Sequence, residues 1–228
     1  MTGQWDSSVM TKEEWEAVYA QKGGYWKWNN DGKRLHARIV SSGVCTLEFF
    51  NTDRVLRHPV LVVAAMKTLL AKAQGVGLRL EDVDAVVGPA MGAIVPSYEV
   101  TRQINEGRDE TECLNAYVMK NGDTMEFRRM RLNRGMRVLI VEDVNATGRS
   151  IAATKKAVEL AGCTALPHVL MFVDRTASDT IADLKVSALL THEVKVYQPY
   201  ECPACKAGSK WVDPKIDGNW EPLIDEAA

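Results

Sequence analysis

Two adjacent acids and the hydroxyl- and glycine-rich loop that follows them carry the clearest chemical signal in this sequence. Glu142 and Asp143 end the apolar run Val138–Val141, and the loop Asn145–Ser150 then leads into a helical pattern. Backbone amides at the start of a helix, together with loop hydroxyls, form a site for phosphate. Two carboxylates would repel phosphate, but they suit the neighbouring hydroxyls of a ribose or a hydrated metal ion. The segment 138–150 therefore predicts a site for a ribose 5-phosphate.

A plainer interpretation of the same segment stays open, because strands often end in acids and many helices begin at a polar turn. Gly148 permits close backbone approach or a positive φ under either interpretation. The sequence has no Gly-x-x-x-x-Gly-Lys pattern, which argues against a P-loop nucleotide hydrolase.

A second glycine-containing loop follows another apolar run. The residues Gly88–Gly92 separate the β-branched run Val83–Val87 from a helical pattern over Ile94–Ile104. Two glycines with small neighbours allow backbone amides to converge on an anion. A tight turn between a strand and a helix explains these residues equally well when they are taken alone.

The elements that must position these loops alternate between helix and strand. Apolar spacing predicts helices over Lys12–Ala20, Val55–Ala73, Ile94–Ile104 and Ile151–Ala161. Short apolar runs predict strands over Val83–Val87, Cys113–Met119, Arg137–Val141, Pro167–Val173 and Val186–Leu190. Such alternation favours an α/β fold with a central, mainly parallel sheet and helices on both faces. Sheets of this kind bind ligands at the carboxyl ends of their strands.

The chain is expected to divide into three segments. Residues 1–54 form an N-terminal cover, or hood, that contains the tryptophans Trp5, Trp15, Trp26 and Trp28. Residues 55–197 form the core. Residues 198–228, which include prolines and alternating charges, are expected to form an irregular tail on the surface or at an interface.

Bulk composition is that of an ordinary globular protein. The 228 residues are 46% hydrophobic and carry a formal net charge of -2, which argues against a general nucleic-acid binder. No apolar run reaches the roughly 18 residues of a membrane helix. The polar N-terminus lacks the pattern of a signal peptide, so a cytoplasmic location is expected. Five scattered cysteines fit reduced thiols better than a disulfide framework.

The segment 138–150 resembles the signature of the type I phosphoribosyltransferases, in which an apolar strand, two acids and a Thr-Gly loop follow one another. The resemblance implies that Glu142 and Asp143 contact the ribose hydroxyls, with Asp143 acting on Mg²⁺ indirectly through water or substrate. It also implies a loop that binds the 5-phosphate, made of Asn145, Ala146, Thr147, Gly148, Arg149 and Ser150. Arg149 departs from the small residue usual in the family, so it either adds charge to the site or points into solvent.

Two further segments resemble parts of the same family. The family's pyrophosphate loop corresponds to Gly88, Pro89, Ala90, Met91 and Gly92. The basic stretch before the signature strand resembles the family's mobile catalytic loop, and the resemblance gives a catalytic role to Lys120, Arg128 and Arg129. A solvated basic strand is the alternative, most of all for Arg131 and Arg134.

Within the family, the closest resemblance is to the orotate phosphoribosyltransferases. Ser42-Gly43 and Phe49-Phe50-Asn51 are similar to their base-site segment, although Val44 and Cys45 replace a basic pair. Asp174-Arg175 is similar to the dipeptide whose arginine binds the orotate carboxylate. The resemblance implies that Phe49, Phe50 and Arg175 bind the base, with an ion pair to Asp174 or Asp179 as the alternative for Arg175, and core packing as the alternative for the two phenylalanines.

The motif Cys202-Pro203-Ala204-Cys205 also occurs in a subgroup of the orotate enzymes. One Cys-x-x-Cys provides only two metal ligands, and the sequence contains no second pair. His192 is the nearest histidine along the chain. The sequence therefore favours a structural metal here only weakly.

The resemblance implies an enzyme of the type I phosphoribosyltransferase fold with Mg²⁺ as cofactor, which binds phosphoribosyl pyrophosphate and a nucleobase-like acceptor and forms a homodimer. It would exchange pyrophosphate at ribose C1 for the nitrogen of a base, with orotate ranked first. No nucleic-acid or membrane partner is expected. A transferase for another base in nucleotide salvage ranks second, because of Val44 and Cys45. A non-catalytic sensor of phosphoribosyl pyrophosphate ranks third.

Overall fold

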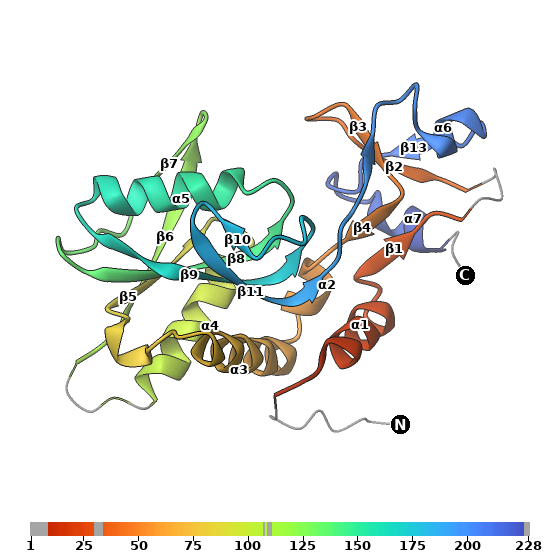
Figure 1. Cartoon of the computed structure of the whole chain (residues 1–228). Coiled ribbons are helices and arrows are strands. Elements are labelled where there is room, and N and C mark those ends of the chain that lie inside the picture. The colour runs from red at the N-terminus through yellow and green to blue at the C-terminus, as the bar shows by residue number, and fades with distance from the viewer. Residues whose placement is uncertain (1–8, 30–33, 107, 109–110, 226–228) are drawn as a thin grey trace.

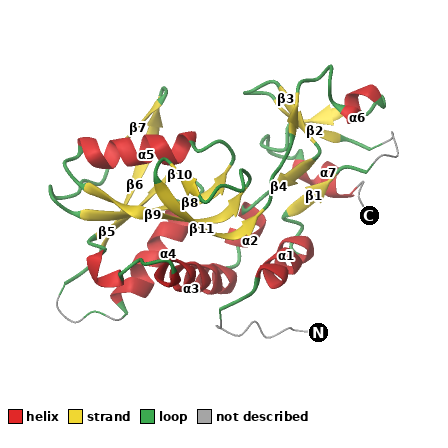
Figure 2. Cartoon of the chain, in the orientation of Figure 1, coloured by secondary structure: helices red, strands yellow, loops and turns green. Residues whose placement is uncertain are grey.

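The computed structural model describes residues 9–29, 34–106, 108 and 111–225, and shows a larger body built around one sheet beside a smaller body (Figures 1 and 2). The large sheet has the strand order β10-β11-β9-β8-β5-β6-β7. The strands are β5 (Ala85–Pro89), β6 (Leu114–Asn121), β7 (Thr124–Glu126), β8 (Arg137–Asn145), β9 (Thr164–Asp174), β10 (Thr180–Ile181) and β11 (Leu184–Thr191). The five inner strands are parallel, and β10 and β7 pair antiparallel at the two edges. The predicted α/β class is confirmed.

Helices cover both faces of this sheet. In Figure 1, α3 (Pro59–Gly75) and α4 (Ile94–Asn105) lie on one face and α5 (Arg149–Leu160) lies on the other. All five residues of β5 are buried, as are Val138–Val141 of β8, because helices exclude water from both sides of these strands. Because the inner strands are parallel, their carboxyl ends lie at the same edge of the sheet, and the predicted binding loops begin there.

The predicted helix over residues 55–73 is two helices. A short α2 (Asp53–Leu56) ends before His58, whose backbone is extended with φ −108° and ψ 96°. The residue before a proline is pushed out of the helical region by the proline ring, and Pro59 itself is suited to the first turn of α3. A 3₁₀ turn over Leu80–Asp82 then leads into β5.

Strand β9 starts three residues before its predicted start and contains Pro167. The β8–β9 ladder shifts register here: Val138 pairs with Ala165, but Ile140 pairs with Val169. Proline has no amide hydrogen to donate to a ladder, so it is tolerated at such an irregularity. The pairing is regular beyond it as far as Asn145 and Asp174.

The smaller body, called the hood below, is built from both ends of the chain. It contains β1 (Tyr25–Lys27), β2 (His36–Ile39), β3 (Val44–Thr46), β4 (Glu48–Phe50), β12 (Val196–Tyr197), α6 (Pro203–Lys206), β13 (Trp211–Val212) and α7 (Trp220–Asp225). β1 pairs with β4, and a second sheet has the order β12-β3-β2-β13. We predicted an irregular tail beyond Tyr197. The structure instead gives this segment regular elements, because β13 pairs with β2 and Trp220 of α7 packs against Phe49.

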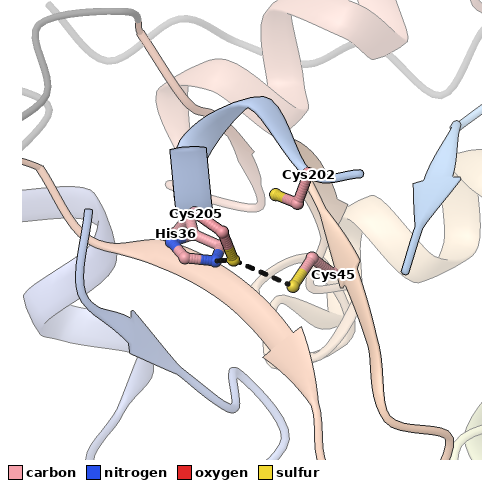
Figure 3. A group of neighbouring side chains, drawn as sticks. All are labelled: His36, Cys45, Cys202 and Cys205. Atoms are coloured by element: carbon pink, nitrogen blue, oxygen red, sulfur yellow. Dashed lines mark hydrogen bonds between the residues drawn. The ribbon is translucent and has the colours of Figure 1, made fainter. Parts of the chain in front are cut away.

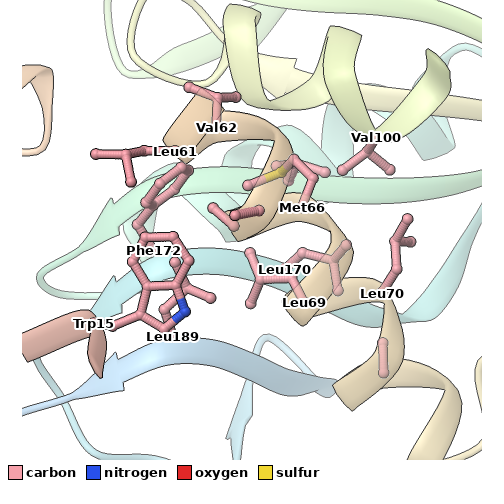
Figure 4. Close-up of a cluster of buried hydrophobic side chains, with 14 of the residues drawn as sticks. Trp15, Leu61, Val62, Met66, Leu69, Leu70, Val100, Leu170, Phe172 and Leu189 are labelled. Atoms are coloured by element: carbon pink, nitrogen blue, oxygen red, sulfur yellow. The ribbon is translucent and has the colours of Figure 1, made fainter. Parts of the chain in front are cut away.

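The N-terminal helix belongs to the main core and not to a separate cover. α1 (Lys12–Gln21) begins at Thr11, which forms a capping box with Glu14. Its Trp15 is completely buried among Leu61, Phe172 and Leu189 in Figure 4. The other predicted cover tryptophans differ: Trp26 and Trp28 lie in the hood, and Trp5 is outside the described residues.

Of the helices in the described part of the chain, none combines the length and the apolar character that crossing a membrane requires.

We predict that Trp15→Ala lowers the free energy of unfolding by about 3–5 kcal/mol, because it leaves a large cavity in a buried cluster. Denaturant titration followed by circular dichroism measures this change. As a control, Val60→Ala removes methyl groups from a side chain that is 63% exposed and should change stability by less than about 0.5 kcal/mol. A loss below about 1 kcal/mol for Trp15→Ala would show that α1 is not part of the cooperative core.

Candidate active site

Three loops meet at the carboxyl edge of the sheet. β5, β8 and β9 are adjacent and parallel, so the residues 88–92, 142–150 and 174–178 emerge side by side. These are the segments to which the sequence assigned pyrophosphate, ribose 5-phosphate and base. The topology thus brings together residues that are more than 80 positions apart in the chain.

Asp143 packs directly against the loop after β5. A Cβ atom on Gly92 would lie 2.2 Å from Oδ2 of Asp143, so only glycine leaves room for this carboxylate. A Cβ on Gly88 would lie 2.5 Å from the carbonyl oxygen of Ala93, so this loop also turns too tightly for a side chain there. The Ala90–Met91 peptide bond is cis, and the Met91 side chain is 84% exposed. The predicted pyrophosphate loop and the predicted ribose acid are therefore in contact.

The two acids at the end of β8 differ in environment. Glu142 is buried, whereas Asp143 is partly exposed. Burial, together with a hydrogen bond and the negative charge of Asp143, raises the pKa of Glu142 well above its ordinary value. The backbone amide of Asp143 donates a 3.0 Å hydrogen bond to Oε1 of Glu142. Asp143 is therefore the one of these two carboxylates that has exposed surface at this edge of the sheet, while Glu142 is buried next to it.

The loop after β8 is shaped by Asn145. Its Oδ1 accepts a 2.7 Å hydrogen bond from the amide of Gly148, which has φ 74° and precedes α5. Its Nδ2 donates to Oδ1 of Asp174 at 2.8 Å and to Oγ1 of Thr176 at 3.2 Å. These bonds occupy the buried amide of Asn145, so its side chain holds the loop in shape. The phosphate contact predicted for the residues of this loop stays a prediction.

Asp174 is the centre of a buried hydrogen-bond network that the sequence did not indicate. Besides Asn145, its carboxylate accepts from the amide and hydroxyl of Thr176 at 3.0 and 2.7 Å and from the amide of Ser178 at 3.0 Å. Its backbone carbonyl accepts from the amide of His192 at 2.9 Å. The sequence considered Asp174 only as an ion-pair partner for Arg175, since nothing in a Phe-Val-Asp-Arg run shows where the carboxylate points.

The start of α5 has the general features that favour the binding of an anion. The first amides of a helix have no carbonyl acceptor within the helix, and the positive end of the helix dipole adds to them. Ala146 and Thr147 are exposed beside these amides, and Ser150 is partly exposed. Arg149 is also exposed and donates from Nε to Oγ1 of Thr147 at 3.3 Å, so it follows the loop rather than entering the protein. A pocket of about 420 Å³ borders Thr147, Gly148 and Arg149.

Arg175 and Phe49 come together although they are 126 positions apart in the sequence. The guanidinium carbon of Arg175 lies 5.8 Å from the centre of the Phe49 ring. Nε of Arg175 is buried and has no hydrogen-bond partner among the described residues, and burial lowers the pKa of this side chain. No described carboxylate pairs with it, because the carboxylate of Asp174 is taken by Asn145, Thr176 and Ser178.

Phe50 does not share this position with Phe49. Successive side chains of a strand point to opposite sides, and Phe50 faces the main core. Its ring lies 5.6 Å from Tyr19, 4.8 Å from Tyr25 and 5.4 Å from His192, measured between ring centres. Both phenylalanines are buried, Phe50 in the main core and Phe49 against Trp220 in the hood core, and of the two only Phe49 faces Arg175.

The predicted catalytic basic residues lie on an exposed hairpin. β6 is parallel to β5, with Val118 beside Pro89, so Lys120, the second-last residue of β6, lies near the 88–92 loop. Arg128 and Arg129 follow β7, and all three side chains are exposed. Arg128 pairs with Glu126 at 3.7 Å, with both side chains nearly half exposed. The structure places Lys120 toward the carboxyl edge of the sheet, and among the described residues Arg128 and Arg129 form no hydrogen bond or ion pair with Glu142 or Asp143.

Comparison with known proteins gives consistent matches. Residues 53–188, more than half of the chain, match the family model described as the phosphoribosyl transferase domain. An orotate phosphoribosyltransferase from Pelotomaculum thermopropionicum is 32% identical over 206 residues, which is 90% of this chain and 97% of that protein. One from Desulforamulus reducens is 34% identical over 179 residues, which is 78% of this chain and 87% of that protein.

A solved structure shows the same fold. The crystal structure of orotate phosphoribosyltransferase from Aeropyrum pernix superposes with a TM-score of 0.59 at 22% identity, covering 77% of this chain and 92% of that one.

We predict that Gly92→Ala weakens the binding of phosphoribosyl pyrophosphate by at least about tenfold, because the new methyl group must displace the Asp143 carboxylate or the 88–92 loop. Isothermal titration measures the affinity. Gly75→Ala is the matched control, since a Cβ there meets no atom within 4 Å, and its affinity should equal that of the parent protein. Equal affinities for both variants would show that the contact between Gly92 and Asp143 does not shape the ligand site.

Proposed function

Because this chain belongs to the phosphoribosyltransferase family, we propose that it transfers the phosphoribosyl group of 5-phosphoribosyl 1-pyrophosphate to orotate, in the synthesis of pyrimidine nucleotides. The match over residues 53–188 establishes the family. The choice of orotate is supported by relatives of that name, which are 32% and 34% identical over most of the chain.

The observation that carries this choice is the state of Arg175. A guanidinium is costly to bury without an anion. The guanidinium carbon of Arg175 nevertheless lies 5.8 Å from the centre of the Phe49 ring, and its Nε is buried with no hydrogen-bond partner among the described residues. Orotate brings a planar carboxylate for the guanidinium fork and a flat ring for the face of an aromatic side chain. A base without a carboxylate would leave the guanidinium unpaired.

The other two loops would hold phosphoribosyl pyrophosphate. Asp143 would accept hydrogen bonds from the ribose hydroxyls, and Glu142, whose pKa is raised, would donate or accept behind it. The first amides of α5, with Thr147 and Ser150, would bind the 5-phosphate. The contact between Gly92 and Asp143 would place pyrophosphate beside the ribose.

The reaction would break the bond between ribose C1 and the pyrophosphate oxygen and form a bond from C1 to a ring nitrogen of orotate. Negative charge grows on the departing pyrophosphate, so donors aimed at its oxygens accelerate the step. The backbone of the 88–92 loop and the nearby Lys120 are suited to this role. Alignment of the two substrates by fixed loops would provide much of the remaining acceleration.

We also propose Mg²⁺ as the cofactor. The donor set fits a hard cation, because Asp143 offers a partly exposed carboxylate next to the proposed pyrophosphate position. Asp143 would hold the ion through water or through the substrate, and the ion would neutralise charge on the pyrophosphate. The exposed hairpin with Lys120, Arg128 and Arg129 would close over the pyrophosphate, and we propose that it does so within a homodimer.

The proposal is tested by mixing the protein, phosphoribosyl pyrophosphate and Mg²⁺ with orotate, uracil, adenine or hypoxanthine and measuring the release of pyrophosphate. Release is expected with orotate only. Release with a purine instead would favour the salvage alternative suggested by Val44 and Cys45. Binding of phosphoribosyl pyrophosphate without turnover of any base would overturn the assignment as an enzyme and favour the non-catalytic sensor.

We predict that Arg175→Ala raises the Michaelis constant for orotate about 10- to 100-fold, the range expected for losing hydrogen bonds to a charged group. The Michaelis constant for phosphoribosyl pyrophosphate should not change. Arg175→Lys should also be impaired, because lysine keeps the charge but lacks the planar fork. Arg79→Ala, which removes an exposed arginine paired with Glu81, is the control. Equal effects on both substrates would rule out a specific role in binding the base.

A further inference from the structure

Four potential metal ligands from distant parts of the sequence meet inside the hood. They are His36 of β2, Cys45 of β3, and Cys202 and Cys205 at α6. Figure 3 shows their side chains turned toward a common point between the strands and the short helix. Their ligand atoms all lie within 4.8 Å of one another. This cluster is separate from the loops at the carboxyl edge of the sheet.

We propose that these four side chains bind one Zn²⁺ ion in a tetrahedral, structural Cys₃His site. This inference goes beyond the proposed function and does not rest on it. Zinc in structural sites prefers four ligands from cysteine and histidine and leaves no position open for substrate. The single Cys-x-x-Cys of the sequence is thus completed by two residues from the opposite end of the chain.

The distances between the ligand atoms agree with this geometry. With Zn–S bonds of about 2.3 Å, two sulfurs of a tetrahedron lie about 3.8 Å apart. The Sγ atoms of Cys45 and Cys205 are 3.7 Å apart. The corresponding separation between sulfur and imidazole nitrogen is about 3.5 Å, and Sγ of Cys205 lies 3.3 Å from Nε2 of His36. A disulfide would need sulfurs about 2.05 Å apart, so the cysteines are arranged for a shared ion.

Ser209 holds Nδ1 of His36, so that the other ring nitrogen, Nε2, faces the remaining ligands. Nδ1 lies 3.0 Å from Oγ of Ser209. The Ser209 hydroxyl lies within donating distance of the carbonyl oxygens of Arg34 and Lys210, so its proton is directed away from the ring. Nδ1 therefore carries the hydrogen and donates it to Ser209, which leaves the lone pair of Nε2 for a metal. Metal-binding histidines are commonly oriented by such a second hydrogen bond.

Burial makes the cluster a closed site. His36, Cys45 and Cys202 have no exposed surface, and Cys205 is partly exposed. The surrounding hood core includes Trp28, whose side chain is 9% exposed. A small core of this kind often needs a metal to hold it together. Cys45 also replaces one member of the basic pair found in orotate enzymes, and ligation explains a cysteine at that position.

The ion would join the two ends of the chain. Cys202 and Cys205 lie in the C-terminal segment, whereas His36 and Cys45 lie in the N-terminal sheet of the hood. Cys45 is only four residues before Phe49 in the sequence. Zinc would therefore fix the strands that carry the proposed base contact without touching the substrates.

The test is the metal content of the purified full-length chain, measured by mass spectrometry of the elements after growth with zinc and purification without chelator. About one zinc ion per chain is expected. Cys205→Ser should reduce this to below about 0.1. Cys163→Ser, a buried cysteine whose sulfur lies 3.3 Å from the carbonyl oxygen of Asn133, should keep the full content. A parent protein that contains no zinc and takes up none on dialysis against zinc would overturn the proposal.

Two further measurements cover a variant that fails to fold. Cobalt(II) should replace zinc in the parent protein and give the visible absorption of a tetrahedral thiolate site, whereas a spectrum of an octahedral ion would contradict the proposal. Ser209→Ala removes the acceptor for Nδ1 of His36 but keeps all four ligands. It should weaken zinc binding about 10- to 100-fold in competition with a chelator, and unchanged affinity would contradict the role given to His36.

Discussion

The carboxylate of Asp174 fixes both halves of the candidate site. It is fully buried and accepts hydrogen bonds from Asn145 on the neighbouring strand and from Thr176 and Ser178 in its own loop. Through Asn145 it sets the position of Gly148 and so the direction in which α5 begins. Through the backbone it sets Arg175, whose amide donates to the carbonyl of Asn145 at 2.9 Å. A buried network of this kind is rigid only when every member is satisfied, so the proposed phosphate loop and the proposed base contact depend on one set of hydrogen bonds.

Charge is distributed unevenly around this fixed frame. Glu142 is buried and its pKa is raised, and Asp143 reaches the surface beside Gly92. The side chain of Arg175 is half-buried and has no anionic partner in the part of the chain that the structure describes. Unpaired buried charge is costly, and such groups cluster at functional sites. An anionic ligand on Arg175 would relieve that cost on binding. In the proposed function, the protein would therefore gain selectivity for a carboxylate from a group that does not favour the folded state on its own.

Local pattern predicted much of this structure, because the apolar runs at β5 and β8 and the helix at α5 are encoded by neighbouring residues. The predicted ribose-phosphate segment rests on the same kind of local signal, since its acids, loop and helix are contiguous. Pattern could not show that Phe50 faces the core while Phe49 faces Arg175, because that depends on how β4 pairs with β1. It also could not assemble the cluster of His36 with three cysteines, because two ligands lie near each end of the chain. The break between α2 and α3 could have been predicted, because Pro59 disfavours a helical conformation at His58. We predicted one continuous helix because the apolar residues on both sides keep a helical spacing.

We propose that Arg175 recognises the carboxylate of the acceptor base. The most direct measurement compares kcat/KM for orotate with that for orotate methyl ester, in which the ring is retained and the negative charge is removed. Because the guanidinium of Arg175 would lose its anionic partner, kcat/KM for the ester should be at least about 100-fold lower than for orotate. Equal values of kcat/KM for the acid and the ester would contradict the account, because the carboxylate would then contribute nothing to recognition.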